Sequence, residues 1–180
     1  ILSREIKIIS GEEEAELVAI SARHNFDMSG KRYAMVDIGG GSVEIITALG
    51  SHVEKVYSLE LGAVVMTERY LSSDPIKLTD LGKFQRHVRA IFKKTFTDEK
   101  QSVQTFIGSG GTITALGSMV MSMRKQAYSS IHGYEVLRSE VVHLLAMLMR
   151  KDLKGRRTIP GLNPDRVDII VAGLAVVDEL

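Results

Sequence analysis

The chain has 180 residues, of which 44% are hydrophobic, and its 23 basic and 22 acidic residues give a formal net charge of +1. The opposite charges are interspersed, so the sequence contains no basic stripe of the kind that binds nucleic acid. The lack of cysteine excludes disulfides and thiolate metal sites. No apolar run approaches the roughly 20 residues of a membrane-spanning helix. We therefore expect a cytoplasmic protein that binds neither nucleic acid nor membrane.

The N-terminal part of the chain predicts one strand and one helix. Residues 5–9 alternate and then run apolar, as a strand does. Ser10 and Glu13 match a capping box that opens a helix, which we expect to end near His24. Because the chain begins with Ile1 and stops inside a helical pattern, we expect an excised piece of a longer protein.

Three strand-like runs follow, over residues 33–37, 43–49 and 52–57. Gly50-Ser51 separates the last two and favours a tight hairpin. Three consecutive antiparallel strands are therefore expected, with a helix over residues 61–70 after them.

The rest of the chain predicts helices around one further strand. Thr79 is a candidate N-cap for an amphipathic helix. Residues 103–107 favour a strand that passes into a helix over about 112–123. A long helix is expected around 139–150, and Asn163-Pro164 is a typical start for the last helix.

A first glycine loop, Asp37-Ile38-Gly39-Gly40-Gly41-Ser42, follows the first of these three strands. Such loops let backbone N–H groups converge on phosphate. Residues 43–47 favour a strand and not a helix, which excludes a Rossmann or Walker element. If Gly40-Gly41 forms a two-residue turn with positive φ, Asp37 lies opposite Glu44. Facing carboxylates predict a site for Mg²⁺ or another divalent cation, or else an ordinary hairpin with solvated acids.

A second loop, Gly108-Ser109-Gly110-Gly111-Thr112, lies where a strand passes into a helix. Its N–H groups would face an anion with the positive end of the helix dipole behind them. The alternative interpretation is a glycine turn in which Thr112 only caps the helix.

Three glutamates, Glu12-Glu13-Glu14, stand in the first turn of the expected N-terminal helix. Acidic residues there complement the helix dipole, and that is the simpler interpretation. A glutamate that reaches a phosphate cleft would instead act as the general base for a water molecule. Arg156-Arg157 is interpreted as an exposed charge pair in preference to a polyanion contact.

Taken together, five ordered motifs resemble the exopolyphosphatase and guanosine pentaphosphate phosphohydrolase family: residues 8–15, 36–44, 61–63, 108–112 and 160–162. That family belongs to the actin, sugar-kinase and heat-shock-chaperone ATPase superfamily, with two lobes around a phosphate cleft. The resemblance implies an α/β, ribonuclease-H-like lobe with a mixed sheet of three antiparallel strands and then a parallel strand, flanked by helices. It also implies that residues 1–30 hold the last strand of the first lobe and the interdomain helix, and that 31–180 form an incomplete second lobe.

The resemblance assigns roles to particular residues. Glu14 would be the catalytic base that activates water. Asp37 and Glu44 would lie on the metal side, with Mg²⁺ or another divalent cation. The phosphate-binding residues would be Gly39, Gly40, Gly41, Ser42, Gly108, Ser109, Gly110, Gly111 and Thr112.

The implied activity of the parent protein is release of the terminal phosphate from inorganic polyphosphate or guanosine pentaphosphate by attack of water. The family also allows a homodimer. Because nothing here matches the phosphate loop of the first lobe, this stretch alone is expected to be inactive. The alternative is an actin-like or chaperone-like nucleotide-binding ATPase module; a sugar or acetate kinase is weaker, because no acceptor site is evident.

Overall fold

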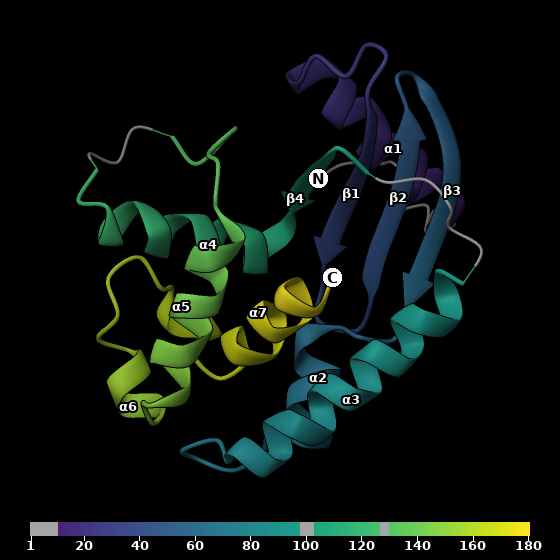
Figure 1. The fold of residues 1–180 in the computed structure, drawn as a ribbon. Helices are drawn as coiled ribbons and strands as arrows, with labels where there is room; N and C mark the ends of the chain where they lie inside the picture. Colours follow the sequence, from purple (N-terminus) through teal and green to yellow (C-terminus); the bar gives the residue numbers. More distant parts are fainter. Residues whose placement is uncertain (1–10, 98–102, 127–129) are drawn as a thin grey trace, which may run out of the picture.

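A four-stranded mixed sheet forms the centre of the computed structural model, which describes residues 11–97, 103–126 and 130–180. The strand order is β3-β2-β1-β4 (Figure 1). The first three strands are antiparallel, and β4 runs parallel to β1, as the resemblance implies. Their bounds are β1 (Arg32–Ile38), β2 (Val43–Leu49), β3 (His52–Leu59) and β4 (Thr105–Ser109). The strand expected over residues 5–9 and the expected cap Ser10 lie outside the described residues.

Helices cover both faces of this sheet (Figure 1). None of the helices in the described residues is both long and apolar enough to cross a lipid bilayer. Their bounds are α1 (Gly11–Asn25), α2 (Ala63–Tyr70), α3 (Leu78–Thr95), α4 (Gly110–Met123), α5 (Arg138–Met149), α6 (Leu153–Arg156), the 3₁₀ helix η1 (Pro164–Arg166) and α7 (Ile170–Glu179).

Two apolar clusters hold the layers together. On one face, Ala22 of α1 packs with Tyr33 of β1 and Ile46 of β2. On the other face lies the larger cluster, and α7 runs through it with every residue from 170 to 176 buried. A helix that is apolar all round is typical of such a central position. Because β1 is sandwiched between the two clusters, its residues form an almost continuous apolar run.

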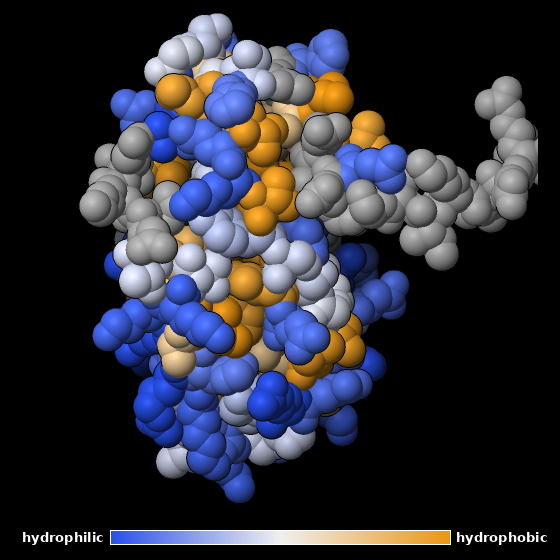
Figure 2. Space-filling model, turned by 90° about the vertical axis from the view of Figure 1, so that its right-hand side faces the viewer, coloured by the Kyte–Doolittle hydropathy of each residue, from blue (hydrophilic) through white to orange (hydrophobic). Residues whose placement is uncertain are grey.

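The outer surface carries scattered apolar side chains. Leu17 and Ile20 of α1 and Val56 of β3 are among the exposed ones. Figure 2 shows a face on which apolar side chains form a vertical band that polar side chains interrupt. Such interrupted apolar exposure is ordinary for a protein surface.

Three predicted element boundaries are wrong for local reasons. Thr79 lies inside α3, whose N-cap is Lys77, because the Lys77 carbonyl already accepts the N–H of Leu81. Asn163 does cap, but it caps η1, and α7 begins only at Ile170. β4 covers residues 105–109 in place of 103–107, since its parallel register with β1 extends to Ser109.

Candidate functional site

The first glycine loop is a hairpin turn that is held from one side by α2. Gly39 N–H donates to the Ser42 carbonyl at 3.1 Å, so Gly40-Gly41 forms the two-residue turn. The carbonyls of residues 39, 40 and 41 accept N–H groups from residues 62–65, at 2.9 to 3.2 Å. Neither Gly40 nor Gly41 has the predicted positive φ. The prediction fails because it considered only the hairpin, whereas α2 fixes the direction of these carbonyls.

This arrangement orients the N–H groups of the loop. In a trans peptide the carbonyl and the following N–H point in opposite directions. Since the carbonyls of residues 39–41 face α2, the N–H groups of Gly40, Gly41 and Ser42 face away from it. Among the described residues these three N–H groups donate to no acceptor. Three neighbouring free donors that face the same way are suited to an anion.

Gly62 is the residue that allows α2 to approach so closely. A Cβ built at this position would come well within 3.0 Å of backbone atoms of Gly40 and Gly41. Real Cβ atoms essentially never show such distances. The Leu61-Gly62-Ala63 motif therefore supports the shape of the first glycine loop from behind.

The second loop begins α4, and its N-cap is Ser109. An N-cap serine normally uses its side-chain oxygen to accept one of the first helical N–H groups. Here Ser109 makes no such bond, because its hydroxyl donates to Asp37 Oδ2 instead. Ser109 therefore caps none of the N–H groups of Gly110, Gly111 and Thr112, which in the first turn of a helix also have no intrahelical acceptor. They stand at the positive end of a 14-residue helix, where anions are stabilised.

Thr112 takes part through its backbone only. Its side chain is 2% exposed and faces Gly173 of α7. The hydroxyl is therefore turned toward α7 and away from solvent, and the N–H of Thr112 is the group that can reach a ligand.

Asp37 joins the two loops. It pairs with Ser109 in the parallel register of β1 and β4, and Gly110 follows at a φ of 83°. A Cβ at Gly110 would lie 2.5 Å from Asp37 Oδ1, so only glycine fits at this position. The free N–H groups of residues 40–42 and the N–H groups that begin α4 therefore flank one carboxylate and belong to one site.

Glu44 stands opposite Asp37, as predicted. Residues that face each other across an antiparallel pair share one face of the sheet. Glu44 Oε1 accepts the Ser42 hydroxyl at 2.5 Å and the Ser58 hydroxyl at 3.2 Å. Ser42 was predicted to bind phosphate; its hydroxyl donates to Glu44, and its N–H is free. Residues 37 and 44 form a pair, and the described residues contain no group of three or more His, Cys, Asp or Glu arranged for a metal ion.

Arg166 is a site residue that the sequence analysis missed. A Cβ placed at Gly111 would overlap three atoms of its guanidinium, which therefore lies directly over the start of α4. Among the described residues Arg166 has no carboxylate partner. Asn163 holds the segment in place by accepting the N–H of Asp165 at 3.0 Å. The available signal was a basic residue in the first turn after Asn163-Pro164.

Glu14 lies in the first turn of α1, as expected for the predicted base. Its side chain is outside the described part of the structure, as are those of Glu12 and Ala15. The role of Glu14 as the base therefore remains a prediction.

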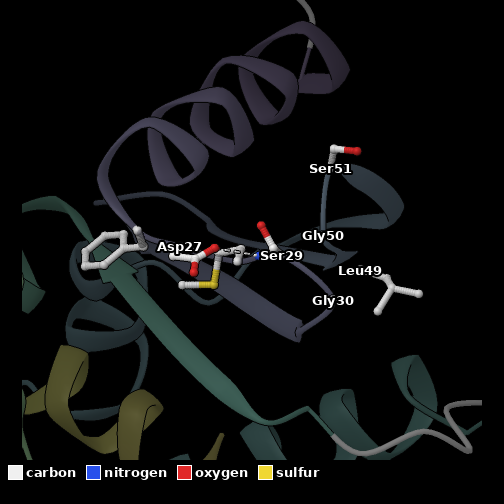
Figure 3. A pocket seen from close by; sticks show the side chains of 8 residues that line it. Asp27, Ser29, Gly30, Leu49, Gly50 and Ser51 are labelled. Atoms are coloured by element: carbon white, nitrogen blue, oxygen red, sulfur yellow. Dashed lines mark hydrogen bonds between the residues drawn. The ribbon is translucent and has the colours of Figure 1, made fainter.

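A separate pocket of ≈ 550 Å³ lies at the other end of β1 and β2 (Figure 3). Residues 26–30 and 49–51 line it, whereas the first glycine loop joins the opposite ends of these strands. Ser29 N–H donates to Asp27 at 3.1 Å, and this bond lowers the pKa of the Asp27 carboxyl. This hollow is built from a loop and a hairpin, and it is no part of the site at the glycine loops.

Comparison with known proteins gives a family match over the whole chain. The family model described as "Ppx/GppA phosphatase family" matches residues 1–180. Exopolyphosphatase 2 of Mycobacterium tuberculosis is 34% identical over 176 residues, which are 97% of this chain and 54% of that protein. The chain thus spans about half the length of the curated relatives it matches.

Solved structures show the same fold. A structure described as an exopolyphosphatase-like protein has a TM-score of 0.86 and 26% identity, and the match covers 99% of this chain and 58% of that one. The PPX-GPPA enzyme of Aquifex aeolicus has a TM-score of 0.84 and 24% identity, with coverage of 95% and 56%. The ribonuclease-H-like lobe expected from the sequence is therefore the fold of this chain.

Proposed function

The chain belongs to the Ppx/GppA phosphatase family, and on that basis we propose that it contributes one side of an active site that removes the terminal phosphoryl group from a phosphate chain. The proposed substrate is inorganic polyphosphate or guanosine pentaphosphate. The observation that carries this proposal is a pair of N–H arrays on either side of Asp37: the free N–H groups of residues 40–42, and the N–H groups of residues 110–112, which no side chain caps.

The two loops are proposed to hold the phosphoryl oxygens. Phosphoryl transfer needs little covalent chemistry from a protein, and mostly requires positioning and neutralisation of oxygen charge. Backbone N–H groups already fixed by α2 and α4 need no reorganisation to provide this. Arg166, over Gly111, adds a full positive charge at the second loop.

Asp37 and Glu44 fit a hard divalent cation such as Mg²⁺. One oxygen of each carboxylate accepts a serine hydroxyl, while Asp37 Oδ1 and Glu44 Oε2 have no donor among the described residues. Mg²⁺ typically takes one or two carboxylates together with water and substrate phosphate. Bound between these residues, it would neutralise charge on the phosphoryl oxygens.

We assign the general base to Glu14. Its carboxylate takes a proton from water as the water oxygen bonds to the terminal phosphorus, and the remaining phosphate chain leaves with the bridging oxygen. The support for this assignment is the motif over residues 8–15, in which Glu14 directly precedes Ala15.

The division into lobes belongs to the same proposal. Residues 1–30 are assigned to the end of the first lobe and the connecting helix, and residues 31–180 to the second lobe. The remaining length of the relatives would supply the opposing side of the cleft. A homodimer and a cytoplasmic location stay predictions.

Phosphate release by the full-length protein tests the assignment. Glu14→Gln should lower kcat by about 10²- to 10⁴-fold, the usual contribution of a general base. Glu13→Gln is the matched control, because one helical position turns a side chain by about 100°. Glu14→Gln with near wild-type activity would show that the base is wrong. Tight ATP binding by a wild-type protein that hydrolyses neither substrate would support the nucleotide-binding alternative instead.

A further inference from the structure

We propose that the surface around α6 is a second polyanion site, which binds the distal part of a long polyphosphate chain. This basic surface consists of Arg150, Lys151, Lys154 and Arg157. The inference rests on the proposed function, since it requires polyphosphate as the substrate. The proposal assigns a role to basic residues that lie outside the glycine-loop site.

The four cations are available to a ligand. Arg150, Lys154 and Arg157 are exposed, and Lys151 is half-buried. None of the four has a carboxylate partner among the described residues. In a chain with a net charge of only +1, four free cations within eight residues are a local concentration of charge. Such a cluster attracts polyanions in a salt-dependent way.

The neighbouring acidic residues are used to build the backbone of this surface. Asp152 accepts the N–H of Gly155 at 2.7 Å and so caps α6. Asp74, from the loop before α3, accepts the N–H of Leu153 at 3.0 and 3.1 Å. These bonds fix the conformation of α6 while the basic side chains point to solvent.

The interpretation of Arg156-Arg157 as an exposed pair is wrong for Arg156, which is buried and adds a fifth positive charge beneath the surface. It is 1% exposed, its Nε donates to the Leu148 carbonyl at 3.2 Å, and its Nη2 has no acceptor among the described residues. Burial lowers the pKa of Arg156, and the charges of Asp74 and Asp152 act in the opposite direction. Arginine stays protonated in proteins. Because buried charges are screened less than exposed ones, Arg156 raises the positive potential of the surface above it.

The position of α6 predicts which ligands can use it. In Figure 1, α6 lies at the lower left, and α5 and α7 stand between it and the sheet. The segment that leads from Arg157 to Arg166 touches Ser118 of α4 through Gly161. Ser118 is about 10 Å along the helix from Gly111. A chain that ends at the glycine loops must therefore extend beyond the roughly 10 Å between Gly111 and Ser118 to reach Lys154 and Arg157.

Polyphosphate substrates of different length therefore test the second site. The double variant Lys154→Glu/Arg157→Glu of the full-length protein should raise KM for long-chain polyphosphate by about tenfold and lower its salt dependence. Its KM for tripolyphosphate and its kcat on both substrates should stay at wild-type values. The matched control is Lys93→Glu/Lys94→Glu, which reverses two exposed cations of α3 and should change neither KM.

Direct binding of long-chain polyphosphate, measured by calorimetry, provides a readout independent of hydrolysis. Weaker binding by the α6 variant alone supports the second site. An unchanged KM, or an equal rise in the α3 control or for tripolyphosphate, overturns it. Loss of single-stranded RNA binding with unchanged polyphosphate binding also overturns it. A wild-type protein that binds long polyphosphate through α6 but hydrolyses no substrate would refute the proposed function and leave the second site intact.

Discussion

Substitution of Gly62 by alanine is predicted to damage the first glycine loop from outside it. The added Cβ would come well within 3.0 Å of the carbonyl carbons of Gly40 and Gly41, where 3.4 Å is the lower limit of ordinary contact. These atoms are backbone and cannot rotate away, so α2 and the loop must separate by about 1 Å. The hydrogen bonds between them are 2.9 to 3.2 Å long and would be broken or badly weakened by such a shift.

The magnitude follows from those contacts. Overpacking of this kind costs about 1–3 kcal/mol, and each lost backbone hydrogen bond adds about 0.5–1.5 kcal/mol. We expect Gly62→Ala to lower the free energy of unfolding of the full-length protein by about 2–4 kcal/mol. Phosphate release should also fall, because the N–H groups of residues 40–42 lose their common direction.

Two other glycines provide controls in urea unfolding. A Cβ at Gly41 meets nothing within 4 Å, so Gly41→Ala should leave stability nearly unchanged. Gly82 lies inside α3, where a Cβ would make only an ordinary contact with the Arg86 guanidinium at 3.7 Å, and Gly82→Ala should stabilise by up to about 1 kcal/mol. Equal stability of Gly62→Ala and Gly41→Ala, with activity retained in the first, would refute the account of α2 as the support of the loop.

Two further predictions concern single side chains. Ser58→Ala removes one of the two hydroxyls that hold Glu44, and it should weaken Mn²⁺ binding, measured by electron paramagnetic resonance, by about tenfold. Ser58→Thr should restore the Mn²⁺ affinity. Equal affinity in the wild type and both variants would exclude this role of Ser58. At Glu140, burial raises the pKa, but hydrogen bonds from Arg124 and the N–H of Leu137 outweigh it and leave the pKa below 4.5. A carboxyl with a lowered pKa stabilises the fold above its unfolded pKa and loses that effect as pH falls through the folded value. Glu140→Gln should therefore flatten the loss of stability below about pH 4.5, and an unchanged pH profile would contradict this.

The opposition of Asp37 and Glu44 could be predicted from the sequence because it depends on local rules. Strands alternate with a period of two, and a Gly-Gly turn sets the register. The succession of strands along the chain and the glycine loops that follow them were accessible in the same way. Local patterns thus predicted both loops and the carboxylate pair.

Other parts of the site depend on contacts between distant segments. The conformation of Gly40 is set by N–H groups of α2, more than twenty residues later in the chain. The guanidinium of Arg166 reaches Gly111 only after the chain has passed through two further helices. Ser109 was predicted to bind phosphate, and its bond to Asp37 required the parallel pairing of β1 with β4. No periodicity or turn rule contains this information.

The serine at the start of α4 has a consequence for the resting protein. Because the Ser109 hydroxyl is committed to Asp37, the first turn of the helix has no side-chain cap. Under the proposed function, the substrate phosphate finishes a piece of secondary structure as it binds, and its departure as product reopens that turn. Turnover would then be accompanied by a cycle of tightening and loosening at one end of a buried helix, and inorganic phosphate alone should slow amide hydrogen exchange there.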